Sequence, residues 1–223
     1  MPQSADTDEP RPLRADARGN RERLLDAARD LFIEYGPRAP LDEIARRAGI
    51  GIATLYRRFP QRRALMRAVV LDALRRTAAE ARQAADEEPD PFRAHVRYMH
   101  GVIAVRTAAV IPALLGEISL DDEEVMRARE AVSAPVEVLV EAAHRAGTLR
   151  PDVTSADIGM LTVRMSRPLA GGFSQETNTS LSHRHLDLII DGLRPPARPS
   201  APLGGPTMTL DDLRQLPGRG DPV

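Results

Sequence analysis

The chain has 223 residues, with 31 basic and 32 acidic side chains and a formal net charge of −1. It contains no cysteine, which excludes disulfide and thiolate chemistry. No apolar run approaches the roughly 18 residues of a membrane span, and the first residues lack a signal peptide's hydrophobic core, so we expect a cytoplasmic protein.

Residues 1–18 are polar and contain prolines, so we expect a flexible arm there. An apolar stripe follows at spacings i, i+4, i+7, i+8 and i+11, which predicts a helix with a broad buried face. Such a face can cover the back of two shorter helices. The members of the stripe are Leu24, Ala28, Leu31, Phe32 and Tyr35.

Two short amphipathic helices are predicted next, over residues 41–48 and 52–59. Gly49 lies between them and can take the left-handed conformation that ends a helix. In the second helix Leu55 and Phe59 face inward, which leaves several small and basic side chains outside. This hairpin is typical of a helix-turn-helix, whose second helix enters the DNA major groove. The alternative is a helical hairpin with no role in DNA binding.

The basic residues are unevenly distributed. Residues 38–67 hold eight arginines against Asp42 and Glu43, a net charge of +6, so the rest of the chain carries −7. A basic face on an acidic protein indicates phosphate binding. Acidic partners are scarce after Glu43, which argues against a merely salt-bridged surface. Lysine is absent, and this bias favours a coding sequence rich in G and C, as in many actinobacteria.

Residues 20–67 resemble the N-terminal DNA-binding domain of TetR-type (TetR/AcrR) transcriptional regulators. The resemblance departs from the family at Gly51, where a capping serine is usual, at Pro40, where a threonine is common, and at Arg62, which replaces a lysine. The matching positions are Leu25, Ala28, Leu31, Phe32 and Gly36, then I-A-R-R-A-G-I at 44–50, then Thr54, Leu55, Tyr56, Phe59, Arg62 and Leu65.

The resemblance implies an all-α fold, with an N-terminal three-helix helix-turn-helix domain over 19–65 and a C-terminal ligand-binding and dimerisation domain over 66–194. It implies a homodimeric DNA-binding regulator, most often a repressor that a small-molecule effector releases from a pseudo-palindromic operator in double-stranded DNA. The residues predicted to lie at the DNA are Arg46, Gly51, Ala53, Thr54, Tyr56, Arg57, Arg58 and Arg62.

A long helix is predicted over residues 60–85, before the run E-E-P-D-P at 87–91. Thr154 and Asp157 have the spacing of a capping box. From residue 195 to 223 proline, glycine and small polar residues predict a disordered tail. Helical patterns lie between, at about 91–109, 111–119, 121–147, 154–171 and 179–194.

The middle helices are predicted to enclose a ligand cavity, because they combine apolar and adaptable methionine side chains. His100, Arg106 and Arg164 are candidate polar anchors, although a surface or salt-bridged position is the favoured interpretation for each. The prolines at 112, 135 and 168 either kink helices or mark their ends. The predicted cavity residues are Phe92, Val96, Tyr98, Met99, Val102, Ile103, Arg106, Leu115, Met126 and Leu139.

Two further apolar stripes predict a dimer interface, because the last two helices of the family pair into a four-helix bundle between subunits. The alternative is an intramolecular core, which the same stripes would fit. The interface residues are Ile158, Leu161, Met165 and Leu169 in one stripe and Leu186, Ile189, Ile190 and Leu193 in the other.

No catalytic or metal site and no cofactor are predicted. The five histidines form no H-E-x-x-H pair, and G-x-S-x-G, phosphate-loop and dinucleotide fingerprints are absent from the sequence. We therefore expect no enzyme. Two alternatives remain open: a helical binding or scaffold protein whose hairpin no longer meets DNA, and an activator on the same fold.

Overall fold

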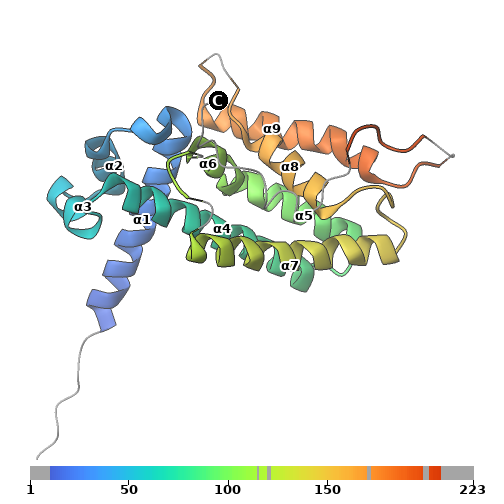
Figure 1. Cartoon of the computed structure of the whole chain (residues 1–223), viewed down its shortest axis with the longest axis horizontal. Helices are drawn as coiled ribbons and strands as arrows, with labels where there is room; N and C mark the ends of the chain where they lie inside the picture. Colours follow the sequence, from blue (N-terminus) through green and yellow to red (C-terminus); the bar gives the residue numbers. More distant parts are fainter. Residues whose placement is uncertain (1–10, 115, 120–121, 170–171, 198–200, 207–223) are drawn as a thin grey trace, which may run out of the picture. The chain divides into compact units, whose positions relative to one another are not determined.

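The computed structural model describes residues 11–114, 116–119, 122–169, 172–197 and 201–206. Its elements are α-helices and two short 3-10 turns, which confirms the predicted all-α fold (Figure 1). Two compact units divide the chain, Met1–Val69 and Val70–Val223, and the boundary falls inside one long helix, α4 (Arg62–Glu87). Each unit is described by itself.

The first unit consists of α1 (Arg11–Tyr35), η1 (Gly36–Arg38), α2 (Leu41–Ala48), α3 (Ile52–Arg58) and the start of α4. Helix α1 packs against α2, and α2 packs against α3 (Figure 1). Their shared core is apolar, as the predicted stripes required. Its fully buried side chains are Leu24, Leu25, Ala28, Leu31, Phe32, Ile44, Leu55 and Leu65.

Helix α1 begins at Arg11, so the predicted arm over residues 1–18 is wrong for its second half. The segment from residue 11 is rich in good helix formers, and Pro12 stands in the first turn, where a missing N–H costs little. Residues 1–10 lie outside the described part. Tyr35 also differs from the prediction, because it ends the helix and is 53% exposed.

The turn between α2 and α3 follows the predicted chemistry. Gly49 has φ 69° and ψ 32°, the left-handed conformation expected of it. Its N–H donates to the carbonyl of Arg46, and the N–H of Ile50 donates to the carbonyl of Ala45 at 3.0 Å. This pair of bonds is a Schellman motif, which satisfies the last carbonyls of α2 and turns the chain into α3.

The second unit contains the rest of α4, then α5 (Pro91–Ala104), α6 (Thr107–Leu114), α7 (Glu123–Arg145), α8 (Ser155–Ser166), α9 (Gln175–Ile190) and η2 (Asp191–Leu193). Helix α5 lies at its centre, in contact with α6, α7, α8 and α9 (Figure 1). The core side chains of these helices form one apolar cluster.

One helix boundary in this unit differs from the predicted one. The break after α5 lies at Arg106, which adopts φ 54°, and not near residue 110. Of the three prolines whose role was left open, Pro112 and Pro135 lie inside α6 and α7, whereas Pro168 follows the end of α8. Thr154 and Asp157 form the predicted capping box, with Thr154 Oγ1 accepting from the Asp157 N–H at 3.1 Å.

We predict that Gly49→Ala lowers the free energy of unfolding by roughly 1 kcal/mol, because a Cβ is disfavoured at a left-handed backbone. No atom lies within 4 Å of that Cβ, so the loss is conformational and not a clash. Urea unfolding followed by circular dichroism measures it.

The matched control is Gly19→Ala in helix α1 of the same unit, where the new Cβ would meet only Arg23 Nη1, at 3.7 Å. That change should stabilise the helix by about 0.5–1 kcal/mol. Equal losses at both positions would contradict the explanation.

Candidate nucleic-acid interface

Helix α3 is held to the first unit by one buried side chain and presents the others outward. Leu55 is 1% exposed, and Phe59 just beyond the helix is half-buried. Tyr56 is 51% exposed, and Thr54 is half-buried. The remaining exposed positions on this side are Gly51, Ile52, Ala53, Arg57 and Arg58.

The exposed side of α3 combines small residues at its start with polar and basic residues at its end. Gly51 and Ala53 are small enough for the helix to approach a groove floor closely, and Gly51 caps the helix without a side-chain hydrogen bond. The methyl groups of Ala53 and Ile52 suit contact with a thymine methyl, and hydroxyls and guanidinium groups suit base edges and phosphates. The residues predicted at the DNA do not include Ile52, which is 40% exposed.

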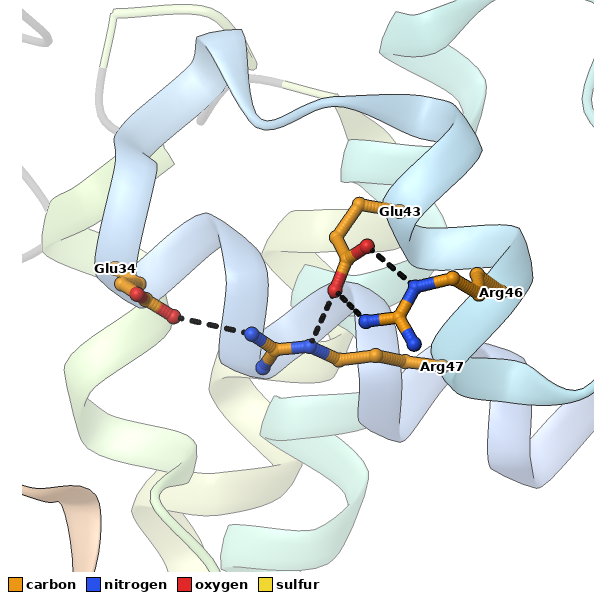
Figure 2. A network of polar contacts seen from close by, with 4 residues as sticks. All are labelled: Glu34, Glu43, Arg46 and Arg47. Atoms are coloured by element: carbon orange, nitrogen blue, oxygen red, sulfur yellow. Dashed lines mark hydrogen bonds and ion pairs between the residues drawn. The ribbon is translucent and has the colours of Figure 1, made fainter.

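Helix α2 contributes a four-residue ion-pair network (Figure 2). The carboxylate of Glu43 accepts from Arg46 Nε at 2.7 Å and Nη2 at 2.6 Å, and from Arg47 Nε at 3.1 Å. Arg47 Nη2 also lies 3.6 Å from Glu34 Oε2, which belongs to α1. The network therefore links α2 to α1 as well as the two arginines to each other.

The network shows that the basic face is partly neutralised. Hydrogen bonds from Arg46 and Arg47 lower the pKa of Glu43 to about 2, so the carboxylate is charged at any physiological pH. The expectation that the basic face is not salt-bridged is thus wrong for these two arginines, because Glu43 itself and Glu34 pair with them. Arg46 remains 73% exposed, and a phosphate would have to compete with Glu43 for it. Exposed ion pairs are weak, so such competition is feasible.

Arg62 has a structural role that its charge alone did not reveal. It lies in the first turn of α4, half-buried, and its Nη1 donates to the carbonyl oxygens of Pro37 and Ala39, the first at 3.1 Å. These carbonyls belong to the connection between α1 and α2. Arg62 therefore ties the start of α4 to that connection, a role that the sequence did not predict. Arg57, by contrast, has no ion-pair partner among the described residues.

The residues predicted to line a ligand cavity lie mostly in the core of the second unit. Val96 and Arg106 are half-buried. Met126 is 44% exposed, so its assignment to the cavity wall is wrong, and Leu115 lies outside the described residues. The buried members are Phe92, Tyr98, Met99, Val102, Ile103 and Leu139.

The structure shows the surroundings of two predicted polar anchors, His100 and Arg164. His100 Nδ1 lies 2.7 Å from His183 Nδ1, and His100 Nε2 lies 3.1 Å from Asp187 Oδ1. His100 is therefore engaged in the contact between α5 and α9. Arg164 is exposed on α8 and does not point into the core.

The predicted dimer stripes divide between two environments. Leu161, Met165 and Ile189 are half-buried, and Leu169 is 47% exposed. Sequence reasoning missed Leu188, which is 71% exposed on α9, and Phe173, which is 50% exposed before it. Four residues belong to the unit's own core, so their assignment to the interface is wrong: Ile158, Leu186, Ile190 and Leu193.

The described part of the chain contains neither a membrane span nor a metal site. Over the described ranges, no helix has the length and apolar character needed to cross a bilayer. In the same part of the chain, no group of three or more histidine, aspartate or glutamate side chains is arranged to hold a metal ion.

Comparison with known proteins gives matches for both units. Residues 24–69 match the family described as bacterial regulatory proteins, tetR family. Residues 90–195 match the C-terminal domain of SbtR-like transcriptional regulators. A search of curated proteins gave no match.

Solved structures extend the similarity over most of the chain. A TetR transcription regulatory protein from Mycobacterium vanbaalenii is 38% identical, over 82% of this chain and 99% of that one, with a TM-score of 0.59. A TetR transcriptional regulator from Streptomyces coelicolor is 31% identical, over 79% and 99%, with a TM-score of 0.59. The TetR-like regulator LfrR from Mycobacterium smegmatis, solved with proflavine, shares the fold at 21% identity, over 77% and 96%, with a TM-score of 0.55.

We predict that Glu43→Gln strengthens binding to any DNA duplex severalfold, because it releases Arg46 and Arg47 to phosphates and removes a negative charge. The salt dependence of the binding constant should steepen. Fluorescence anisotropy with a labelled duplex at several salt concentrations measures both.

Asp42→Asn is the control, because it removes the same charge from the neighbouring exposed position without breaking an ion pair of the described residues. Its effect should be the smaller one. Equal gains for the two variants would mean that the Glu43 network does not restrain the arginines.

Proposed function

Because the chain belongs to the TetR family of bacterial transcriptional regulators, we propose that it is a homodimeric repressor that a small-molecule effector releases from its operator. Members of this family are DNA-binding transcription factors and not enzymes. The observation that carries the proposal is the outward side of α3, which holds Tyr56 and Arg57 exposed on a three-helix frame.

In the proposed complex, α3 lies in the major groove of double-stranded DNA. Thr54, Arg57 and Ala53 contact base edges, since they lie on the exposed side of the helix. Phosphate contacts from Tyr56, Arg58 and Arg46 set its position, with Gly51 at the groove floor and Arg62 supporting the frame from α4. Two such helices in a symmetric dimer reach half-sites about 34–36 Å apart on a pseudo-palindromic operator.

The proposed dimer contact centres on α9. Leu188 is 71% exposed, more than any other large apolar side chain of the described residues. Leu169 and Phe173, exposed in the connection before α9, extend the apolar surface. Pairing of α8 and α9 with their symmetry mates would bury all three.

The effector is proposed for the second unit, whose apolar core is far larger than DNA binding requires. The LfrR structure holds proflavine, which illustrates that this fold can accommodate a small molecule in another protein. An effector that favours a dimer with the wrong spacing of α3 helices lowers operator affinity, and operator DNA must lower effector affinity by the same factor.

Two substitutions in α3 test the DNA contacts. Arg57→Ala should weaken operator binding about tenfold more than binding to a scrambled duplex, because a base contact carries specificity. Tyr56→Phe should weaken both duplexes equally, because it removes only a phosphate hydrogen bond. Anisotropy titrations against the promoter beside the protein's own gene measure both.

Arg127→Ala is the control for charge, since this arginine is exposed on α7 of the other unit. It should leave both affinities unchanged. If the unaltered protein binds no duplex, the proposal fails and a scaffold or binding role replaces it.

A second prediction concerns assembly. Leu188→Glu should convert the dimer to a monomer, because two carboxylates would face each other across an apolar contact. Light scattering coupled to size-exclusion chromatography measures the mass. Val138→Glu is the matched control, since Val138 is 54% exposed on α7, and this variant should stay dimeric. A dimer that survives Leu188→Glu rules out the proposed contact.

A further inference from the structure

The interior of the second unit contains an imidazole whose hydrogen-bonding groups are unused. His95 of α5 has no exposed surface, and neither Nδ1 nor Nε2 has a hydrogen-bond partner among the described residues. Buried polar groups in folded proteins are nearly always paired, so an exception of this kind needs a specific explanation. Sequence reasoning did not single out this histidine as an anchor.

The ring is neutral at physiological pH. Burial, and to a smaller extent a coulombic interaction with His144 on α7, lower the pKa of His95 to about 4. A neutral imidazole carries one N–H donor and one bare nitrogen that accepts. No carboxylate among the described residues acts on this pKa, so none of them supplies a counter-charge to His95.

The surroundings of His95 have the composition of a ligand site. Phe92 and Met99, one turn away on either side in α5, are 1% and 0% exposed. Tyr98 is 3% exposed, burial raises the pKa of its phenol, and its hydroxyl has no hydrogen bond among the described residues. A few polar groups within an apolar enclosure are what small-molecule pockets present.

A surface groove reaches the same part of α5. It measures about 470 Å³ and is lined by Phe92, Val96 and Ile190 together with charged side chains of α5 and α9. The guanidinium of Arg194 lies 3.9 Å from the centre of the Phe92 ring. Phe92 lines this groove and also packs into the core, one turn before His95 in the same helix.

We propose that His95 is the polar anchor of the effector site, and that the effector is an apolar molecule with one weakly acidic O–H group, such as a carboxylic acid or a phenol. The inference rests on the proposed function, because it names the chemistry of that effector. The ligand oxygen pairs with a ring nitrogen, either by donating its O–H to the bare nitrogen or, once ionised, by accepting from the N–H. A protonated amine is disfavoured, because its charge would be buried where no carboxylate of the described residues acts on His95.

Calorimetric titration with two pairs of probes tests the proposal. Each pair has one apolar body, with the O–H group free or capped: decanoic acid with methyl decanoate, and 4-hexylphenol with 4-hexylanisole. In at least one pair the free O–H compound should bind about tenfold more tightly than its capped partner. His95→Leu should abolish that preference, and Met99→Leu, a similar change at a buried apolar neighbour, should keep it.

Thermal unfolding without any probe gives a second readout. His95→Leu should raise Tm, because an apolar side chain of similar size replaces two unpaired polar atoms. A lower Tm would mean that the ring is bonded within the protein or by a buried water, and would overturn the proposal. So would the absence of a preference in both pairs, or a preference that survives His95→Leu.

The two proposals fail separately. If the unaltered protein binds operator DNA but neither O–H compound is preferred, the repressor proposal stands and the acidic-effector proposal is wrong. If the protein binds no duplex, the repressor proposal fails, while the calorimetric comparison still decides the role of His95.

Discussion

A helix of seven residues cannot maintain itself in water, and the DNA-binding unit is organised around this constraint. Helix α3 depends on Leu55, which is fully buried, and on the Schellman turn at Gly49, which aims the chain into it. Because Leu55 is the buried side chain that attaches α3 to the core, the other positions of α3 can hold side chains of any kind without loss of this packing. The same arrangement leaves the exposed side chains of α3 available to a partner without weakening the packing of α1, α2 and α3.

The arginines of this unit divide into two groups that their charge does not distinguish. Arg62 and Arg47 bond within the protein, the first to carbonyl oxygens and the second to two carboxylates. Arg57 lies exposed with no such ion pair among the described residues. Guanidinium groups suit both tasks, because their planar fork matches carbonyls and carboxylates as well as phosphates. A count of basic residues therefore overestimates the charge that is available to DNA.

In the second unit, α5 is the element on which the others depend, since α6, α7, α8 and α9 all contact it. A buried polar group on this helix is expensive unless something pairs with it, at about 1–3 kcal/mol for each unsatisfied group. His95 is such a group, whereas His100 of α5 already contacts His183 and Asp187 of α9. A molecule that pairs with His95 would therefore act on the helix through which the whole unit is packed.

The sequence by itself determined the all-α class, the capping box at Thr154, the left-handed Gly49 and the inward Leu55, because each depends on local spacing or backbone chemistry. Only the tertiary structure decided which side of α9 lies in the core. Leu186 and Leu188 are two positions apart, yet Leu186 is buried and Leu188 is exposed. An apolar stripe in the sequence does not show which element packs against it. It also decided that Arg62 binds the connection between α1 and α2, and that His95 is buried with no hydrogen-bond partner among the described residues. Those facts depend on contacts between distant residues, and spacing along one helix carries no information about them.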